Sequence, residues 1–508
     1  MNRKDLISLL ISGFVIAASC DKPEKPGEGD RPSPGGSNNT ELLVPEISGE
    51  YYNYALTNQP ERPYMLEYHN SMMVKMFMSS PKMGMNEDYT YGAIGTNVNM
   101  TYTDVINNIR YMDAISRGMH KIVYLVGWQY NGHDDQYPAF WGFNSSLTGG
   151  EGASAKESYL NVQKKAKEEY NTTVSVHINM TDAREDSFYW PTYVANDMLC
   201  RNKHGDFCNS GNLSFGNNIS LPNYEVCLVN EWKKGYTADR IHRVIDACNL
   251  KYAKTVHIDA FKPYKSEYHG YTLDDADQVM RKIIRYFRDQ GVDVTTEFWQ
   301  DFGRVDRFIG LSPACWWNNF TIEDRVGIHP KLACGGEAGT WMSGQDWNHI
   351  GFLFGETPHC ETYLGRSSDW TKFTHEFCTL AVQYVLLNNH DLLTYDFNKG
   401  VATYSGGIVV NYPAKSLEIN GKLFRKSNDV FLPALWIKDH KEIIAYSENG
   451  YSSKTWDLPA DWSGVSSVEV WKVTKDGLSD KRTIDVVRGR LTLSLDKGQM
   501  LSVQAVEK

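Results

Sequence analysis

Hydrophobic residues recur along the middle of the chain with two different periods. Four segments carry apolar residues at spacings of three and four, as amphipathic helices do, and lie at 103–118, 156–170, 238–249 and 273–290. Each is followed by a short apolar or β-branched run, at 122–126, 174–178, 255–258 and 292–296. Runs of this kind are typical of parallel strands buried on both faces. The pattern therefore predicts repeated helix–strand units.

Units of this kind build either a (β/α)8 barrel or a doubly wound sheet. Each run ends in polar and aromatic residues, for example the stretch 128–135 after the first run. In a barrel the carboxyl ends of the strands meet at one mouth, where active sites are built, and no glycine-rich phosphate fingerprint follows any run. We predict an α/β fold with a (β/α)8 barrel, and place further strands near 74–78 and 308–311.

The pattern changes after a long helix expected at 370–388. Short alternating strands separated by turn residues follow, for example at 406–412, 441–450, 466–473 and 489–499. We predict a barrel domain over residues 44–395 and an all-β sandwich over residues 400–508. The expected role of the sandwich is support, with carbohydrate binding as the alternative.

The amino terminus has the pattern of an export signal. Arg3 and Lys4 precede an apolar run at 6–18, which is too short to cross a bilayer as a helix. The run ends in Ala-Ala-Ser-Cys20, which is similar to the lipobox of bacterial lipoproteins. We predict a signal peptide at 1–19 and lipidation of Cys20; an ordinary signal peptide followed by a chance cysteine is the alternative.

Residues 21–40 are rich in Pro, Gly, Ser and charge, so they cannot form a core. We predict a flexible tether at 20–43. A lipid, a tether and a globular body together indicate a protein of the bacterial cell envelope, at the outer membrane surface or in the periplasm. The lipid would then be its contact with the membrane.

Composition narrows the choice of partner. The chain has 508 residues, of which 41% are hydrophobic and 22% charged, so it is globular. Its net charge of -10 argues against nucleic acid or an anionic membrane surface as a partner. The 14 Trp and 30 Tyr fit either a large core or faces that stack on sugars. Among the cysteines, Cys200 and Cys208 are the best candidates for a local disulfide, and no zinc spacing occurs.

Two acids stand where neighbouring strands are expected to end. Asp259 and Glu297 are 38 residues apart, which leaves room for one helix and two loops. Adjacent strands lie roughly 5 Å apart, which suits the pair of carboxyl groups, about 5–5.5 Å apart, of a retaining glycosidase. The alternative is that each acid caps a helix or binds a stray cation. Asp293, Asp301 and Glu267 are rival carboxylates that fit a strand end less well.

The polar strand ends resemble one known family. The stretch Tyr-Leu-Val-Gly-Trp-Gln-Tyr-Asn-Gly-His-Asp, ending at Asp134, resembles the Gly-His-Asp segment of glycoside hydrolase family 101, the endo-α-N-acetylgalactosaminidases. Val-His177-Ile-Asn179-Met-Thr-Asp resembles its His-x-Asn-x-Ser/Thr-acid segment. The strands that end at Asp259 and Glu297 resemble its nucleophile and acid/base segments, in the same order. The resemblance covers roughly residues 100 to 320.

The resemblance implies a (β/α)8 barrel and retaining, endo-acting hydrolysis of mucin-type O-glycans. The product would be Galβ1-3GalNAc, released from Ser or Thr of a glycoprotein. Asp259 would be the nucleophile and Glu297 the acid/base. With the aromatic residues around the strand ends, the expected substrate-binding residues are Trp128, His133, Asp134, His177, Asn179, Trp299, Trp317 and Gln345. We expect no cofactor and no metal, because no third ligand with recognisable spacing accompanies His133 and His177.

The chain also departs from the family. Family members are longer and carry extra domains, and Asn131 stands where an acidic residue often precedes Gly-His-Asp. An exo-acting α-galactosidase or α-N-acetylgalactosaminidase is therefore one alternative. A non-catalytic, surface glycan-binding lipoprotein is another, but the helix–strand alternation and the two acids favour an enzyme.

Overall fold

The computed structural model describes residues 42–85, 90–214, 220–297, 308–316, 326, 328–332, 334–335 and 347–506. The predicted signal peptide, the lipidated Cys20 and nearly all of the tether lie outside these residues. Within them, the helices all lack the length and hydrophobicity that a bilayer span requires.

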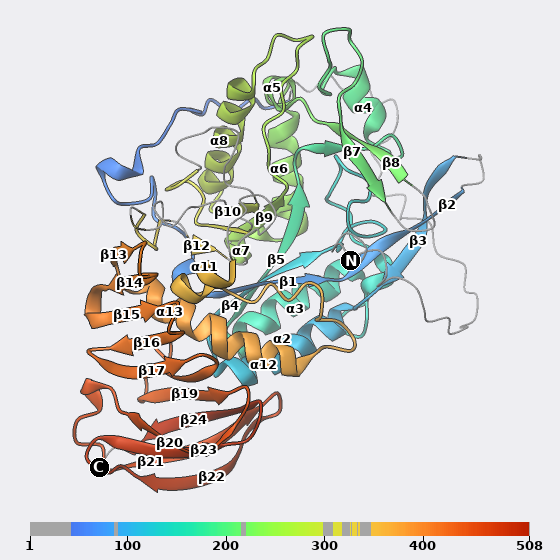
Figure 1. The fold of residues 1–508 in the computed structure, drawn as a ribbon. Helices are drawn as coiled ribbons and strands as arrows, with labels where there is room; N and C mark the ends of the chain where they lie inside the picture. The colour runs from blue at the N-terminus through green and yellow to red at the C-terminus, as the bar shows by residue number, and fades with distance from the viewer. Residues whose placement is uncertain are drawn as a thin grey trace.

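A seven-stranded parallel sheet forms the centre of the larger region (Figure 1). Its strands, in spatial order, are β1 (Met72–Phe77), β4 (Lys121–Val126), β5 (Thr172–Asn179), β9 (Thr255–Asp259), β10 (Asp293–Glu297), β11 (Ala314–Trp316) and β12 (Cys334–Gly335). Spatial order follows chain order, as in successive βα units. The predicted α/β fold is confirmed, although in the described part of the chain β12 does not pair back to β1 and the sheet stays open.

The sheet is strongly curved. Lys75 on β1 forms an ion pair with Glu297 on β10, although three strands lie between them in the sheet. At roughly 4.8 Å per strand, four steps across a flat sheet would separate them by about 19 Å, far beyond the reach of a lysine side chain. The contact therefore crosses the inner face of an arc, the geometry of a partial barrel.

Four long helices cover the outside of this arc. They are α2 (Tyr102–Ser116), α3 (Ala155–Tyr170), α6 (Tyr236–Ala247) and α8 (Leu273–Asp289), each within two residues of the predicted bounds. Thr101 and Thr272 begin α2 and α8 with capping boxes, in which the threonine oxygen accepts the N–H of the third helical residue. In α8, Val279, Ile283 and Phe287 are buried at spacings of four, as the amphipathic pattern requires.

Two small sheets project from the carboxyl edge of the parallel sheet (Figure 1). The hairpin β2 (Ser79–Met85)–β3 (Tyr91–Val98) follows β1, and the sheet β6 (Asp182–Ala183)–β8 (Ser220–Glu225)–β7 (Asn209–Ser214) follows β5. Shorter helices complete the region: α4 (Trp190–Ala195), α5 (Leu228–Lys233), α7 (Leu250–Ala253) and α11 (Trp347–Phe354). The insertions therefore gather on the side where barrel enzymes build their sites.

Two local expectations are wrong. The strand predicted at 308–311 is a turn, and β11 begins only at Ala314. Phe308 and Gly310 have φ of 57° and 81°, a left-handed backbone that cannot join a strand.

Cys200 and Cys208 are free thiols, joined only through the main chain, where the Cys208 N–H donates to the Cys200 carbonyl (2.8 Å). The Cys200 thiol instead lies against Cys227.

A β-rich region follows the last long helix, which consists of α12 (Trp370–Glu376), a π-helical turn (Phe377–Ala381) and α13 (Val382–Asn388). Its main sheet is antiparallel, with ten strands in the order β13-β14-β15-β16-β17-β18-β19-β24-β21-β22. These are β13 (Leu392–Asp396), β14 (Val401–Tyr404), β15 (Ile408–Asn411), β16 (Ser416–Ile419), β17 (Lys422–Lys426), β18 (Asp429–Pro433), β19 (Glu442–Ser447), β24 (Gln499–Ala505), β21 (Ser467–Thr474) and β22 (Gly477–Asp485). The predicted β-rich carboxyl-terminal region is confirmed.

A second, two-stranded sheet packs against this main sheet. It consists of β20 (Tyr451–Asp457) and β23 (Arg490–Leu495). The Trp456 ring stacks on Phe431 of the main sheet, with ring centroids 5.3 Å apart. Two sheets therefore face each other only in the last part of the chain.

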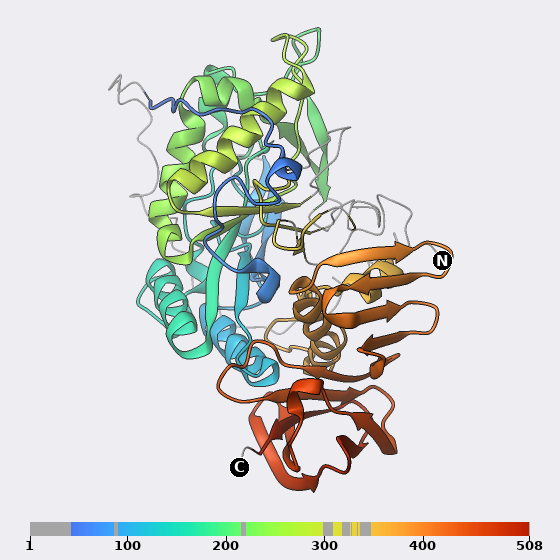
Figure 2. The ribbon, with the colours of Figure 1, turned by 90° about the vertical axis from the view of Figure 1, so that its left-hand side faces the viewer.

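The β-rich region is attached firmly to the α/β region, and α12 and α13 lie between them (Figure 2). Arg117, at the end of α2, pairs with the buried Glu442 of β19 (2.8 Å). Arg425 of β17 donates to the Thr379 carbonyl of the π-helical turn (2.7 Å). Buried side chains of both regions form one continuous core. These contacts fit the predicted supporting role.

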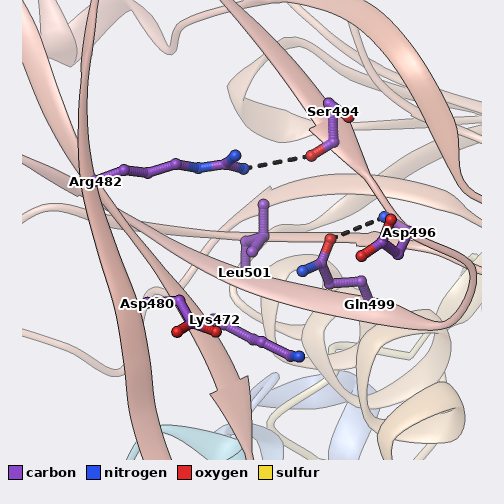
Figure 3. A pocket seen from close by; sticks show the side chains of 7 residues that line it. All are labelled: Lys472, Asp480, Arg482, Ser494, Asp496, Gln499 and Leu501. Carbon is purple, nitrogen blue, oxygen red and sulfur yellow. Dashed lines mark hydrogen bonds between the residues drawn. The ribbon is translucent and has the colours of Figure 1, made fainter.

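A polar hollow lies between strands of the β-rich region (Figure 3). Its lining is Lys472, Asp480, Arg482, Ser494, Asp496, Gln499 and Leu501. Arg482 donates to the Ser494 carbonyl (3.3 Å), and the Asp496 N–H donates to the Gln499 side chain (2.8 Å). None of these seven residues offers an aromatic face on which a sugar ring could stack.

Candidate active site

The predicted acids stand at the carboxyl ends of adjacent strands, as expected. Asp259 is the last residue of β9 and Glu297 the last of β10, and these strands pair in parallel. Successive side chains of a strand point to opposite faces, so Thr255, His257 and Asp259 share one face of β9. The pairing of His257 with Thr295 places Glu297 on that same inner face. His177 of β5 pairs with His257 and joins the group from the other side.

His177 lies between the two carboxyl groups. Its Nε2 atom is 3.8 Å from Asp259 Oδ1 and 4.0 Å from Glu297 Oε1. The two carboxyl oxygens can therefore be no farther apart than the sum of these distances. The side chains differ in exposure, because Asp259 is 17% exposed and Glu297 only 3%. Asp259 thus faces the open side of the site.

Glu297 is held as a buried carboxylate. The Lys75 ammonium forms an ion pair with it, His257 Nε2 lies 3.6 Å from Oε1, and the Ala260 N–H donates to Oε2 (3.3 Å). Burial alone would raise the pKa of Glu297, but Lys75, with His177 and His257, outweighs this and holds that pKa well below its usual range. At neutral pH, Glu297 is ionised in this geometry.

The pKa of Asp259 shifts in the opposite direction. Burial, followed by the negative charges of Glu297 and Asp134, raises the pKa of Asp259 well above its usual value. Burial also lowers the pKa of His177 to about 4 and that of His257 well below its usual value, so both rings are neutral. The surroundings therefore favour a proton on Asp259 and a negative charge on Glu297.

The Gly-His-Asp stretch forms one wall of the site. His133 Nδ1 lies 2.8 Å from Asp134 Oδ1, and the rings of His133 and His177 are 5.4 Å apart. Burial lowers the pKa of His133, but Asp134 more than offsets this and raises it. Glycine is needed at Gly132, because φ is 132° and a Cβ atom would come within 2.8 Å of the Ser80 main chain. This close approach ties the stretch to the β2–β3 hairpin.

Two predicted substrate ligands have structural roles here. Trp128 is fully buried, and its indole N–H donates to the His177 carbonyl (3.0 Å). The Asn179 side chain accepts the N–H groups of Thr181 and Asp182 (2.8 and 2.9 Å) and donates to the Asp182 carboxyl group (2.8 Å). Both residues shape the strand ends on which His177 and Asp259 stand. Trp299, Trp317 and Gln345 lie outside the described residues.

Sequence reasoning assigned no role to Lys75. A lysine inside the apolar run Met-Met-Val-Lys-Met-Phe was the available signal, because a charge in a buried strand requires a partner. Trp316 belongs to β11, and its ring lies 5.1 Å from the Lys75 ammonium and 4.8 Å from the His257 ring. These side chains enclose the inner side of Glu297.

The site contains donor atoms of the kind that bind metals. His133, His177 and Asp259 form one group of atoms within 4.8 Å of one another, and His177, His257 and Glu297 form another. The spacing in the sequence did not reveal this clustering. The Lys75 ammonium already pairs with Glu297 Oε1, so a cation placed there would meet a like charge. The arrangement is suited to acid–base chemistry between carboxyl groups.

Comparison with known families agrees with this geometry. The family model of glycoside hydrolase family 101, described as endo-alpha-N-acetylgalactosaminidase, matches residues 77–311. This segment includes both strand-end acids and the histidines beside them. The resemblance seen in the sequence is confirmed over residues 77–311, which match a glycoside hydrolase family model. No curated protein matches the sequence significantly.

Similar solved structures include those of the alpha-N-acetylgalactosaminidase NagBb from Bifidobacterium bifidum. Its GalNAc complex is 10% identical, with a TM-score of 0.53 over 70% of this chain and 58% of that chain. Its quadruple mutant is also 10% identical, with a TM-score of 0.51 over 69% of this chain and 57% of that chain. This chain thus spans less than two thirds of the length of NagBb, and the similarity is one of fold.

Proposed function

We propose that this protein is a retaining glycoside hydrolase that cleaves α-linked N-acetylgalactosamine of mucin-type O-glycans, and that it is endo-acting. The observation that carries the proposal is the pair Asp259 and Glu297, which stand on adjacent strand ends and both lie within 4.0 Å of His177 Nε2. A retaining glycosidase needs a carboxylate nucleophile and a carboxylic acid that flank the scissile bond. The family description and the printed name of NagBb support N-acetylgalactosamine as the sugar.

In the proposed reaction Asp259 attacks the anomeric carbon and Glu297 protonates the leaving oxygen of Ser or Thr. Glu297 then takes a proton from the water that hydrolyses the glycosyl–enzyme intermediate. In the substrate-free structure the raised pKa of Asp259 and the lowered pKa of Glu297 favour the proton on Asp259, so it must pass to Glu297 before the attack. Positive charge that develops at the anomeric carbon favours ionised Asp259, which drives the transfer in the required direction.

The polar residues beside the pair would hold the sugar. His133 and Asp134 are partly exposed and His177 lies beside Asp259, where hydroxyl groups of the sugar would need donors and acceptors. In the endo mode the second sugar, galactose, needs space beyond this wall. An exo-acting α-N-acetylgalactosaminidase is the second candidate, because the structurally similar NagBb is named an alpha-N-acetylgalactosaminidase.

The test is hydrolysis of aryl α-glycosides of GalNAc and of Galβ1-3GalNAc by the wild type, Asp259→Ala and Glu297→Gln. We expect release of the disaccharide by the wild type, with the α-anomer as the first product seen by NMR. Full activity in Asp259→Ala would contradict the mechanism. Release of GalNAc without the disaccharide would establish the exo mode, and a β-anomer as first product would indicate inversion.

The cellular location belongs to the same proposal. Cys20 would carry the lipid, and the tether at 20–43 would hold the enzyme at the cell envelope, where glycoprotein substrates are reachable. Metabolic labelling with a fatty acid should mark the wild type and leave Cys20→Ala unlabelled. Labelling of both would exclude Cys20 as the anchor.

We also propose that the curved sheet closes into a complete (β/α)8 barrel.

A further inference from the structure

The apolar strand β1 carries one charged side chain at its centre. Lys75 is 1% exposed and is flanked along the strand by the buried Val74 and Met76. Moving an ammonium group from water into such surroundings is costly unless a charged partner meets it. That partner is Glu297, one of the two acids on which the proposed reaction depends.

We propose that Lys75 is a positioning residue of the reaction: its ammonium sets the number of protons on the Asp259–Glu297 pair, keeping one carboxyl group charged and one protonated. The inference rests on the proposed function and deepens it. Lys75 would bind no sugar atom and would act through the two acids. The ammonium contacts Glu297, so it stabilises the charged form of this carboxyl group over that of Asp259.

The position of Lys75 is set from several elements. Its main-chain N–H donates to the His359 carbonyl (3.0 Å), and its ammonium lies 5.1 Å from the Trp316 ring centroid. A cation over an indole face is attracted by the ring. The main chain and the ring therefore direct the ammonium towards the acids.

The other ionisable groups around Glu297 do not supply a permanent positive charge. The titratable groups that face the cluster are Asp259, His177, His257, His133, Asp134, His359 and Glu361. His177 and His257 are neutral, and His133 is engaged with Asp134. Glu361 contacts His359 (3.0 Å) and remains ionised, since its pKa lies at about 2. Among these described groups, Lys75 is the counter-ion of Glu297.

Removing the ammonium has a predictable sign. An adjacent cation stabilises the carboxylate form, so its loss makes the pair bind both of its protons more tightly. The form with one proton would then exist at higher pH. Both limbs of the bell-shaped pH profile of kcat/KM should therefore move in the alkaline direction, by about one pH unit or more.

The experiment compares pH profiles of kcat/KM on an aryl α-GalNAc substrate. Lys75→Met removes the charge and keeps the length, and Lys75→Arg keeps the charge. The matched control is Lys121→Met. Lys121 is buried at the amino-terminal end of the neighbouring strand β4, away from the two acids, and pairs with Asp113 (2.6 Å). We expect an alkaline shift in Lys75→Met, and limbs in place for Lys75→Arg and Lys121→Met.

A purely structural role would give a different result. Lys75→Met would then lower kcat/KM by the same factor at every pH and leave both limbs in place, which would overturn the proposal. Circular dichroism establishes that each variant is folded. If Lys75→Met does not fold, Lys75→Gln removes the charge with a polar side chain and must show the same alkaline shift.

A measurement independent of turnover separates this inference from the proposed function. Infrared spectra of protein labelled with ¹³C at the glutamate carboxyl carbon, with Glu297→Gln subtracted, report the titration of Glu297 directly. Its midpoint should rise in Lys75→Met, and an unchanged midpoint would overturn the role of Lys75. If the midpoint rises but the wild type hydrolyses no α-GalNAc glycoside, the proposed function fails and the role of Lys75 as counter-ion stands.

Discussion

Strand β10 begins with one carboxyl group and ends with another, and the two have opposite surroundings. Asp293, at the amino edge of the sheet, accepts the Met65 N–H (2.7 Å) and the Tyr68 hydroxyl (3.1 Å). Burial raises the pKa of Asp293 to about 6, against the lowering effect of these donors and of Arg288. Glu297, at the carboxyl edge, faces the Lys75 ammonium and two imidazole rings and is ionised.

The difference shows how one strand serves two purposes. Both acids are buried and, being four residues apart, lie on the same face of β10. At the amino edge, the two groups that donate to Asp293 are uncharged and belong to the segment that precedes β1. At the carboxyl edge, charged groups remain close to one another and to the open side, as barrel enzymes require. The edge, and not the residue type, decides the role of each acid.

The largest expected effect is on activity, and it differs between the acids at the two edges of the sheet. Asp259→Ala should lower kcat/KM on aryl α-GalNAc by roughly 10⁴-fold or more, because it removes the nucleophile. Asp293→Asn, the matched control at the other edge, should stay within about threefold of the wild type, since it touches no reacting group. Steady-state kinetics measures both. A comparable loss of kcat/KM in Asp293→Asn would show that the acid at the amino edge also serves the reaction.

The next effect depends on the leaving group. Glu297→Gln removes the proton donor, so hydrolysis of a serine-linked glycan should fall by about 10²–10⁴-fold. A nitrophenyl glycoside, whose leaving group needs little protonation, should be less affected. The ratio of the two rates in wild type and variant is the measurement. Equal losses on both substrates would assign Glu297 a role other than the acid.

The third effect is on stability. Glu297→Gln leaves the Lys75 ammonium buried without its carboxylate, which should cost about 3–5 kcal/mol in the free energy of unfolding. The double variant Lys75→Met/Glu297→Gln removes the stranded charge and should recover most of that loss. Urea unfolding of the wild type, Lys75→Met, Glu297→Gln and the double variant gives the coupling energy between the two side chains. Additive losses would show that the pair contributes no coupling.

The smallest expected effect is the pH dependence that Asp293 causes. Its pKa is about 6 in the folded protein and 3.8 in the reference state, so the folded protein binds the extra proton between these values. The contribution of Asp293 to stability therefore falls as pH rises from about 4 to about 6, by on the order of 3 kcal/mol, and is constant above that. In Asp293→Asn the contribution is absent. Urea unfolding at pH 4.5 and 7.5 measures the free energy of unfolding. It should fall more between these two pH values in the wild type than in Asp293→Asn.

Most regular elements around the site could be predicted because local patterns determine them. The apolar spacing of α8 and its Thr272 cap are contained in one short segment, and so is the alternation that places Asp259 at the end of β9. The turn at 308–311 was missed because it depends on a left-handed backbone at Phe308, which the apolar composition of the segment does not reveal. Cys200 and Cys208 are close in sequence, but the isolated β-bridge between Leu199 and Val226 brings Cys227 beside Cys200.

The sequence by itself determined that acids end neighbouring strands, because side-chain alternation and chain order need no knowledge of distant contacts. Only the tertiary structure decided what those acids meet. Lys75 and Glu297 are separated by 222 residues and by three intervening strands, and they touch because the sheet is curved. The charge state of Glu297, the proton on Asp259 and the neutral rings of His177 and His257 all follow from that curvature. Burial and Coulomb energy depend on three-dimensional distance, which a linear pattern does not contain.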